Sequence, residues 1–391
     1  MPDHARCSIL AVAVLLLAAA LGGCQPPAPA EIAAIRTTAP APTGTAAPSP
    51  TAAPTAADLP APSPTPGASA TLPPTHTPSP EPTATDGPTP TPSPTPTTPP
   101  LLAYTIEALA ARQYGESDLL VQQELPSSLP FHQYVMEYRS DGMQVTGLAY
   151  VPFGEGPFPV VIVLHGYTSP AEYFRGFDAA LLAETYALNG YAAIMPDYRG
   201  YMGTAGGPNP MRIPYAIDVL NLIGSLGTLD VLDETRVGVI GHSMGGGVAT
   251  YVMVLAPEVD AVVLYGSMSA DQAVNWAYIA ETWSRYWMDR TAQVYGSPET
   301  HPELYAAISP VHYLDRVQMP VQIHHGDADT VVPVEWSRDL AGRLQQADVD
   351  VTYYEYPGAP HTFTGAELQL LRERTLSFFN QHVKRKNDPL F

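Results

Sequence analysis

Cysteine and long hydrophobic runs are scarce in this chain of 391 residues, which contains only Cys7 and Cys24. Both cysteines lie close to the N-terminus, so a domain built from the later residues has none left for a disulfide bond. The apolar run at residues 9–21 is too short for an ordinary transmembrane helix. These absences argue against a disulfide-stapled domain and against a helix that spans the bilayer.

Positive charge is also scarce. Lysine and arginine together number 18 against 38 aspartates and glutamates, which gives a formal net charge of −20. An acidic surface repels both the phosphate backbone and anionic lipid headgroups. The charge therefore argues against nucleic acid as a partner and says little about the substrate.

Signals for a bound cofactor are missing as well. The chain has no phosphate-binding loop and no metal-ligand spacing. His324 and His325 are adjacent on a predicted strand, where neighbouring side chains point to opposite faces. We therefore expect neither a nucleotide nor a metal cofactor.

Proline is abundant, with 44 residues, and it is concentrated between residues 25 and 100 among alanine, threonine and serine. This segment has too little apolar surface to offset the entropy of folding, so we predict a disordered, partly polyproline-II stalk. The remaining residues, 101–391, have a length that suits a single α/β domain.

The first 24 residues resemble a bacterial lipoprotein signal peptide. The apolar run ends in Leu21-Gly22-Gly23-Cys24, which is similar to a lipobox whose cysteine carries the lipid anchor. The prediction is a protein held by Cys24 at the extracellular face of a bacterial membrane or cell envelope. A plain secretory signal with a chance cysteine, and hence a secreted protein, is the alternative.

Apolar runs and amphipathic segments alternate after residue 130. Strands are predicted at residues 160–164, 191–195, 237–240, 261–265, 321–325 and 351–356, and helices at 176–189, 210–226, 247–256, 334–346 and 367–383. Residues 134–139 and 144–151 alternate in polarity and predict an antiparallel pair at the edge of the sheet. This pattern favours an α/β fold with a mostly parallel central sheet and helices on both faces.

Residues 271–315 interrupt the alternation. Trp276, Ile279, Trp283 and Trp287 fall at helical spacing. They predict either an aromatic helical cap over the active site or an amphipathic helix packed on the core, and the spacing does not separate these interpretations.

The run Gly241-His242-Ser243-Met244-Gly245-Gly246 follows a predicted buried strand and precedes a predicted helix. A strand, a sharp turn and a helix around G-x-S-x-G are typical of the nucleophile elbow of an α/β-hydrolase. The flanking glycines leave room for the strained turn that exposes the serine. Ser243 is therefore the candidate nucleophile.

A nucleophilic serine needs a base, and the base needs an orienting acid. In this fold the acid and the histidine follow the serine in that order, which favours Asp329 and His361, each in a loop after a predicted strand. Asp327 is a rival acid whose alternative role is to hold the turn. His324, His325 and His382 are less favourably placed bases.

Two backbone N–H groups should form the oxyanion hole. One belongs to Met244, directly after the nucleophile, and the other to Tyr167, in the loop after the strand at 160–164. His165, in the same loop, is interpreted as structural.

Together these motifs resemble the catalytic domain of the prolyl oligopeptidase (S9) family and its esterase relatives among the α/β-hydrolases. The resemblance covers about residues 134–383 and includes Asp197-Tyr198-Arg199-Gly200. It implies an acyl-enzyme on Ser243 that water resolves. Peptidases of that family usually carry an N-terminal β-propeller, where this chain has a proline-rich segment, and the Gly-His-Ser-Met-Gly elbow is widespread among esterases and lipases.

The sequence therefore predicts a serine hydrolase that cleaves carboxylic esters or short acyl-peptides. A true S9-type peptidase or aminopeptidase is the alternative within enzymes. A surface binding module on an inactive hydrolase fold is the alternative from another class, and the filled positions of the triad argue against it.

Overall fold

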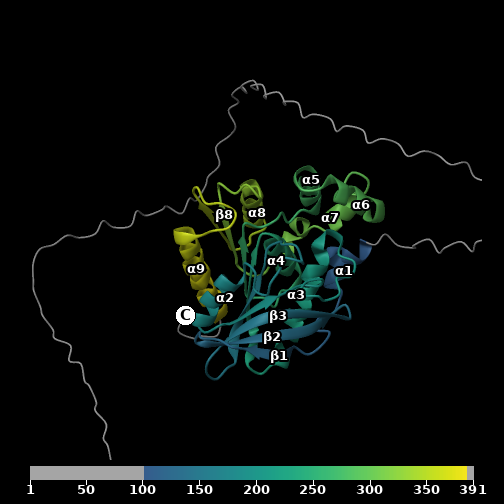
Figure 1. Cartoon of the computed structure of the whole chain (residues 1–391). Coiled ribbons are helices and arrows are strands. Elements are labelled where there is room, and N and C mark those ends of the chain that lie inside the picture. The colour runs from purple at the N-terminus through teal and green to yellow at the C-terminus, as the bar shows by residue number, and fades with distance from the viewer. Residues whose placement is uncertain (1–100, 385–391) are drawn as a thin grey trace, which may run out of the picture. The chain divides into compact units, whose positions relative to one another are not determined.

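The predicted strands belong to one sheet, with helices packed around it (Figure 1). The computed structural model describes residues 101–384, so the predicted signal peptide, Cys24 and the stalk at 25–100 lie outside the described residues. The nine strands occur in the order β1-β2-β3-β5-β4-β6-β7-β8-β9. They are β1 (Leu120–Leu125), β2 (Phe131–Ser140), β3 (Met143–Pro152), β4 (Phe158–Leu164), β5 (Ala192–Pro196), β6 (Leu232–His242), β7 (Ala261–Tyr265), β8 (Val321–Gly326) and β9 (Val351–Tyr356).

The sheet is mostly parallel, as predicted. Strands β5, β4, β6, β7, β8 and β9 run parallel to one another, and β1, β2, β3 and β5 pair antiparallel. The antiparallel pair β2–β3 is confirmed, but the prediction that it forms the edge is wrong, because β1 lies outside it. Strand β1 is largely exposed and has no apolar alternation to mark it.

Helices cover both faces of the sheet. They are α1 (Ile106–Ala110), α2 (Ala180–Leu188), α3 (Ile213–Ser225), α4 (Met244–Leu255), α5 (Gln272–Thr282), α6 (Arg285–Tyr295), α7 (Pro302–Ala307), α8 (Val334–Gln346) and α9 (Gly365–Phe379). Helices α2 and α9 share one apolar core through Tyr186 and Phe379. Helices α3, α4 and α8 contribute to the core on the other face.

Two predicted helices begin later than expected. Helix α2 starts at Ala180 rather than residue 176, after a series of turns. The segment 210–226 is divided, because Met211 and Arg212 adopt left-handed backbone conformations with φ of 50° and 61° and separate a short 3-10 turn from α3. The sequence places no glycine at either position, so it gave no signal for this break.

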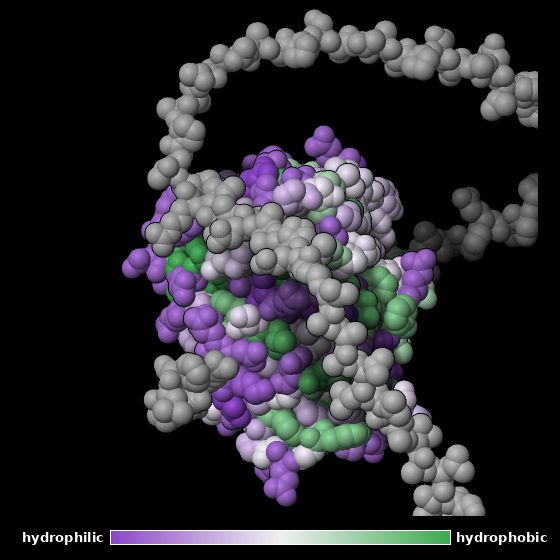
Figure 2. All heavy atoms as spheres, turned by 90° about the vertical axis from the view of Figure 1, so that its left-hand side faces the viewer, coloured by the Kyte–Doolittle hydropathy of each residue, from purple (hydrophilic) through white to green (hydrophobic). Residues whose placement is uncertain are grey.

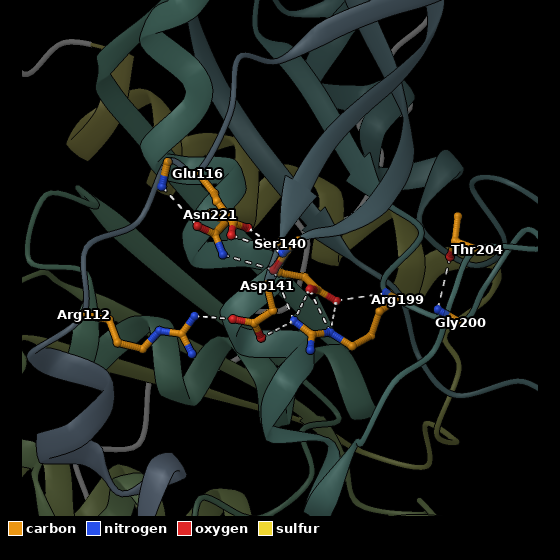
Figure 3. A network of polar contacts seen from close by, with 11 residues as sticks. Arg112, Glu116, Ser140, Asp141, Arg199, Gly200, Thr204 and Asn221 are labelled. Atoms are coloured by element: carbon orange, nitrogen blue, oxygen red, sulfur yellow. Dashed lines mark hydrogen bonds and ion pairs between the residues drawn. The ribbon is translucent and has the colours of Figure 1, made fainter.

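A buried polar network fixes the loop after β5 to the turn between β2 and β3. The Arg199 guanidinium donates to Asp218 at 2.7 Å, and both side chains are buried. Figure 3 shows that Arg199 also reaches Ser140 and Asp141, and that Arg112 approaches Asp141 from the opposite side. The motif Asp197-Tyr198-Arg199-Gly200 thus holds this loop in place.

The predicted interruption at 271–315 forms the helices α5, α6 and α7 between β7 and β8, and these lie together on one side of the domain in Figure 1. The face shown in Figure 2 carries separate hydrophobic patches among hydrophilic residues. Within residues 101–384, no helix has both the length and the apolar character needed to cross a bilayer.

Candidate active site

Ser243 stands at a strained turn between β6 and α4. Its backbone has φ of 54° and ψ of −115°, a conformation that non-glycine residues rarely adopt. The Ser243 N–H donates to the Tyr265 carbonyl at 2.9 Å, and the Ser243 carbonyl accepts from Met268 N at 3.0 Å. These bonds hold the serine at the carboxyl end of the sheet, in the geometry of a nucleophile elbow.

The glycines of the elbow are required by close backbone approach. A Cβ at Gly245 would lie 2.3 Å from the Leu164 carbonyl oxygen, and one at Gly241 would lie 2.2 Å from the Gly245 carbonyl oxygen. Both distances are far inside van der Waals contact. The sequence therefore permits β4, β6 and the first turn of α4 to meet at this point.

The structure brings His361 and Asp329 together. Asp329 follows β8, and His361 follows β9. The His361 Nδ1 lies 2.6 Å from Asp329 Oδ2, which leaves Nε2 as the proton-accepting nitrogen. The His361 ring also lies against Gly266, at the end of β7, the strand that pairs with the strand leading into Ser243.

The environment suits these two groups to their predicted roles. Burial would raise the pKa of Asp329, but hydrogen bonds with His325, His361 and the Val332 N–H outweigh it and hold the pKa below its usual range. Burial lowers the pKa of His361, and the hydrogen bond with Asp329 opposes this only in part. At neutral pH the pair therefore consists of a carboxylate and a neutral imidazole able to accept a proton.

Asp327, the rival acid, contacts the backbone of the loop after β9 and not that of its own turn. Its Oδ1 accepts a hydrogen bond from the Gly358 N–H at 2.5 Å. His324 and His325 point to opposite faces as predicted, since His324 contacts Tyr356 and His325 contacts Ser337 of α8.

A second histidine shares the Asp329 carboxylate, which sequence reasoning did not predict. His325 Nε2 lies 3.0 Å from Asp329 Oδ2, and its Nδ1 lies 2.6 Å from Ser337 Oγ. The other oxygen, Oδ1, accepts from the N–H groups of Val331 and Val332 at 2.8 and 2.9 Å. The only available signal was the His-Gly-Asp-Ala-Asp run, where His325 stands four residues before Asp329.

Asp178 and His242 form a further acid–histidine pair that the sequence did not reveal. His242 Nδ1 lies 2.6 Å from Asp178 Oδ2, and His242 Nε2 lies 3.2 Å from the His361 carbonyl oxygen. Asp178 also accepts the Gly166 N–H at 3.1 Å. One carboxylate thus connects the loop after β4, the residue before the nucleophile and the His361 loop.

Met244 and Tyr167, the predicted oxyanion donors, both border one cavity. Met244 is the first residue of α4, and the first N–H groups of a helix have no acceptor within that helix. Tyr167 follows Gly166 in the loop after β4. The neighbouring His165 is 1% exposed and packs against Tyr173 and Tyr198, as its structural interpretation requires.

The cavity next to these residues, here called the cap pocket, has a volume of about 420 Å³. Trp283 and Trp287 line it and are 51% and 66% exposed, whereas Trp276 is 6% exposed and packs on Tyr305. Trp276 thus packs as the second interpretation expects, whereas Trp283 and Trp287 line a pocket, and a cap over the active site stays a prediction. The cap pocket is lined by Tyr167, Asn209, Pro210, Met211, Arg212, Met244, Gly247, Val248, Tyr251, Met268, Gln272, Asn275, Ile279, Trp283, Ser284, Trp287, Met288, Thr291 and Tyr295.

Known proteins share this fold and parts of this sequence. The chain is 26% identical over 286 residues to the uncharacterized peptidase YuxL of Bacillus subtilis, which is 69% of this chain but 41% of that protein. The chain thus spans less than half of that relative's length.

Two solved structures show the same fold. An acylaminoacyl peptidase of Pyrococcus horikoshii superposes with a TM-score of 0.56 at 17% identity, over 66% of this chain and 43% of that chain. Acetyl xylan esterase 1 of Thermoanaerobacterium also gives a TM-score of 0.56, at 18% identity, over 71% of this chain and 93% of that chain. The fold is therefore that of an α/β-hydrolase.

The match to a family of known proteins begins near the start of α2 and runs through the end of α9. Residues 177–386, more than half of the chain, match the model of the prolyl oligopeptidase family. This match, together with the α/β-hydrolase fold, shows that the chain belongs to the prolyl oligopeptidase (S9) family.

Proposed function

We propose that this chain hydrolyses carboxylic esters with Ser243 as nucleophile, His361 as general base and Asp329 as orienting acid. The observation that carries the proposal is the 2.6 Å contact between Asp329 and the His361 ring, beside a strained elbow that presents Ser243. Short acyl-peptides are the second substrate class.

The reaction follows from the placement of these groups. The Ser243 hydroxyl passes its proton to His361 Nε2 while its oxygen attacks the ester carbonyl carbon. The Met244 and Tyr167 N–H groups stabilise the oxyanion of the tetrahedral intermediate. His361 then returns the proton to the departing alcohol, which leaves an acyl-enzyme on Ser243. Water, deprotonated by His361, hydrolyses this acyl-enzyme in the same two steps.

Ester substrates are favoured over peptides because this chain aligns with a larger share of an esterase than of a peptidase. The chain aligns with 93% of the acetyl xylan esterase but with 43% of the acylaminoacyl peptidase, so most of the peptidase has no counterpart in the aligned region. The similarity to YuxL and the family match favour the alternative, a true S9-type peptidase.

We also propose that the enzyme acts at the outer face of a bacterial membrane, held by a lipid on Cys24. The support is the Leu21-Gly22-Gly23-Cys24 run and the proline-rich sequence that follows it. A secreted form is the alternative.

The test is turnover of p-nitrophenyl acetate, p-nitrophenyl octanoate and an aminoacyl-p-nitroanilide by the full chain and by Ser243→Ala. Ser377→Ala, at an exposed serine on α9, is the matched control. We expect the parent chain and the control to hydrolyse the esters and Ser243→Ala to lack this activity. None of the three proteins should cleave the anilide. Anilide cleavage that depends on Ser243 would instead establish the peptidase. Equal background from all three proteins, with no labelling by a fluorophosphonate, would leave a non-catalytic binding module.

A further inference from the structure

The cap pocket is lined mainly by apolar and aromatic side chains, with several uncharged polar ones and a single charged one. Among the described residues that line it, Arg212 is the only charged side chain, and neither aspartate nor glutamate is present. This is unusual in a chain with 38 acidic residues and 18 basic ones. The pocket thus has a single positive charge on an otherwise uncharged wall.

Arg212 has no carboxylate partner among residues 101–384. None of the ion pairs there includes it, and its guanidinium instead lies over the Tyr167 ring, 4.4 Å from the centroid. A partly buried guanidinium without an anion keeps unused hydrogen-bond donors in the fork geometry that matches a carboxylate. Tyr167 is also a proposed oxyanion donor, so this cation contacts the side chain of a residue of the proposed oxyanion hole.

The backbone that carries Arg212 is strained. Met211 and Arg212 are consecutive non-glycine residues at positive φ, with Pro210 before them and Pro214 after them. Such conformations persist only where the surrounding structure fixes them, and they gather at binding sites. Arg212 therefore lines the pocket from the left-handed residue directly before α3.

A second polar group of the same segment is also unsatisfied. The Asn209 side chain lines the cap pocket, and its Oδ1 is buried without a hydrogen-bond partner. Since a buried amide atom without a partner is costly, a polar group of a ligand would remove that cost. Arg212 and Asn209 thus offer charge and hydrogen bonding from one short segment.

From these contacts we propose that the preferred substrates carry a carboxylate, which the Arg212 guanidinium binds inside the cap pocket. The apolar walls formed by residues such as Met268, Ile279 and Trp283 accept the hydrocarbon chain between that carboxylate and the scissile ester. This inference rests on the proposed ester hydrolysis and names its substrate class.

The first experiment compares charged and neutral esters of equal length in the full chain. The acyl series pairs p-nitrophenyl half-esters of adipic and suberic acid with their methyl-capped forms. The leaving-group series pairs 4-acetoxybenzoate with its methyl ester. Three variants are used: Arg212→Gln, Arg212→Lys and Arg290→Gln, the last at an exposed arginine of α6 outside the pocket.

We expect Arg212→Gln to lower the ratio of kcat/KM for charged over neutral ester at least tenfold in one series, which identifies the side bearing the carboxylate. Arg212→Lys should restore part of the ratio, and Arg290→Gln should keep it within twofold. Turnover of the neutral ester by Arg290→Gln, which reports the proposed function itself, should stay within twofold of the parent chain. A ratio that Arg212→Gln leaves unchanged in both series would overturn the inference.

A binding measurement decides the inference even if no ester is turned over. Ser243→Ala is titrated with monomethyl suberate and with dimethyl suberate, and fluorescence of Trp283 and Trp287 reports occupancy of the pocket. We expect the anion to bind at least tenfold more tightly, and Arg212→Gln in the same background to abolish the difference. Equal affinities before that substitution would overturn the proposal.

Discussion

Asp329 uses both oxygens of its carboxylate, one for two backbone N–H groups and the other for two imidazoles. A carboxylate held in this way stays ionised and has little freedom to rotate, so it can fix the ring of His361. His325 is fully buried and also contacts this carboxylate. Because it precedes Asp329 in the chain, it lacks the Ser-Asp-His order expected of the general base.

The first prediction concerns pH. Because burial lowers the pKa of His361, its ring becomes protonated at a lower pH than an ordinary histidine does. Asp329, whose pKa is also lowered, stays ionised over the pH range in which His361 becomes protonated. For a neutral ester, kcat/KM should therefore be constant above neutral pH and fall about tenfold per pH unit below the pKa of His361. A midpoint above the ordinary histidine value would contradict this, and His301→Gln on the cap should leave the midpoint unchanged.

The second prediction concerns Asp178, which positions two parts of the site without touching substrate. Asp178→Asn should lower kcat roughly tenfold and change KM less than twofold, because a small displacement of a catalytic group has a large effect on rate. Steady-state kinetics on p-nitrophenyl acetate, with the exposed Asp339→Asn as control, measures this split. An unchanged kcat in a folded variant would show that Asp178 does not position the catalytic groups.

Residue-level roles were only partly predictable. Ser243, Asp329 and His361 stand in motifs whose order is visible in the chain. Asp178 and Arg212 lie in irregular segments before α2 and α3, and only the folded backbone brings them to the site. No sequence spacing connects Asp178 to His242, 64 positions later.

At the level of elements, the elbow depends on how closely β4, β6 and α4 approach one another.

Predicted and observed bounds agree for β7, β9 and α8, where apolar patterning is strong. They disagree where the backbone departs from regular geometry, as at the left-handed residues before α3, or where a strand is exposed, as in β1. Periodicity reports burial, so it cannot locate an element whose side chains face solvent.

The third prediction tests this close approach. Gly245→Ala would place a Cβ 2.3 Å from the Leu164 carbonyl oxygen, which is backbone and cannot rotate away. We expect a loss of about 3 kcal/mol or more in the free energy of unfolding, measured by urea denaturation, because overpacking costs up to that amount even where side chains can adjust. Gly342→Ala in α8, where a Cβ meets nothing within 4 Å, should be neutral or stabilising by about 0.5–1 kcal/mol. Equal stability of the two variants would contradict the geometry.

The fourth prediction concerns the polar network of Arg199. Burial raises the pKa of Asp218, although the Arg199 guanidinium opposes it, so removal of Arg199 leaves a buried acid without its partner. Arg199→Gln should lower the free energy of unfolding by roughly 3–5 kcal/mol. The exposed pair of Arg338 and Glu355 gives the comparison, since Arg338→Gln should cost at most about 1 kcal/mol. Similar costs for both variants would show that the network does not stabilise the loop.

At the scale of the whole molecule, the described residues form one α/β-hydrolase fold with the helices α5, α6 and α7 between β7 and β8. The family follows from the match over residues 177–386, whereas the reaction, the substrate and the location are proposals. The chain has a net charge of −20 and only 18 lysines and arginines. A substrate with a carboxylate therefore has few cations other than Arg212 to bind.

The fifth prediction concerns the location of the protein in a bacterial host. Cys24→Ser should move the full chain from the membrane fraction to the soluble or secreted fraction and abolish incorporation of labelled palmitate, because lipid chains supply the anchor. Cys7→Ser lies within the predicted signal peptide and should leave both readouts unchanged. Equal membrane association of Cys24→Ser and the parent chain would contradict the anchor.

The most direct test of the central claim is the site at which a fluorophosphonate reacts with the full chain. Mass spectrometry of the labelled peptides should find one adduct, on the Ser243 hydroxyl. Ser243→Ala should give none, and His361→Gln should react at least a hundredfold more slowly, because it lacks the base. An adduct on another serine, or equal labelling of Ser243→Ala, would contradict the assignment of the nucleophile.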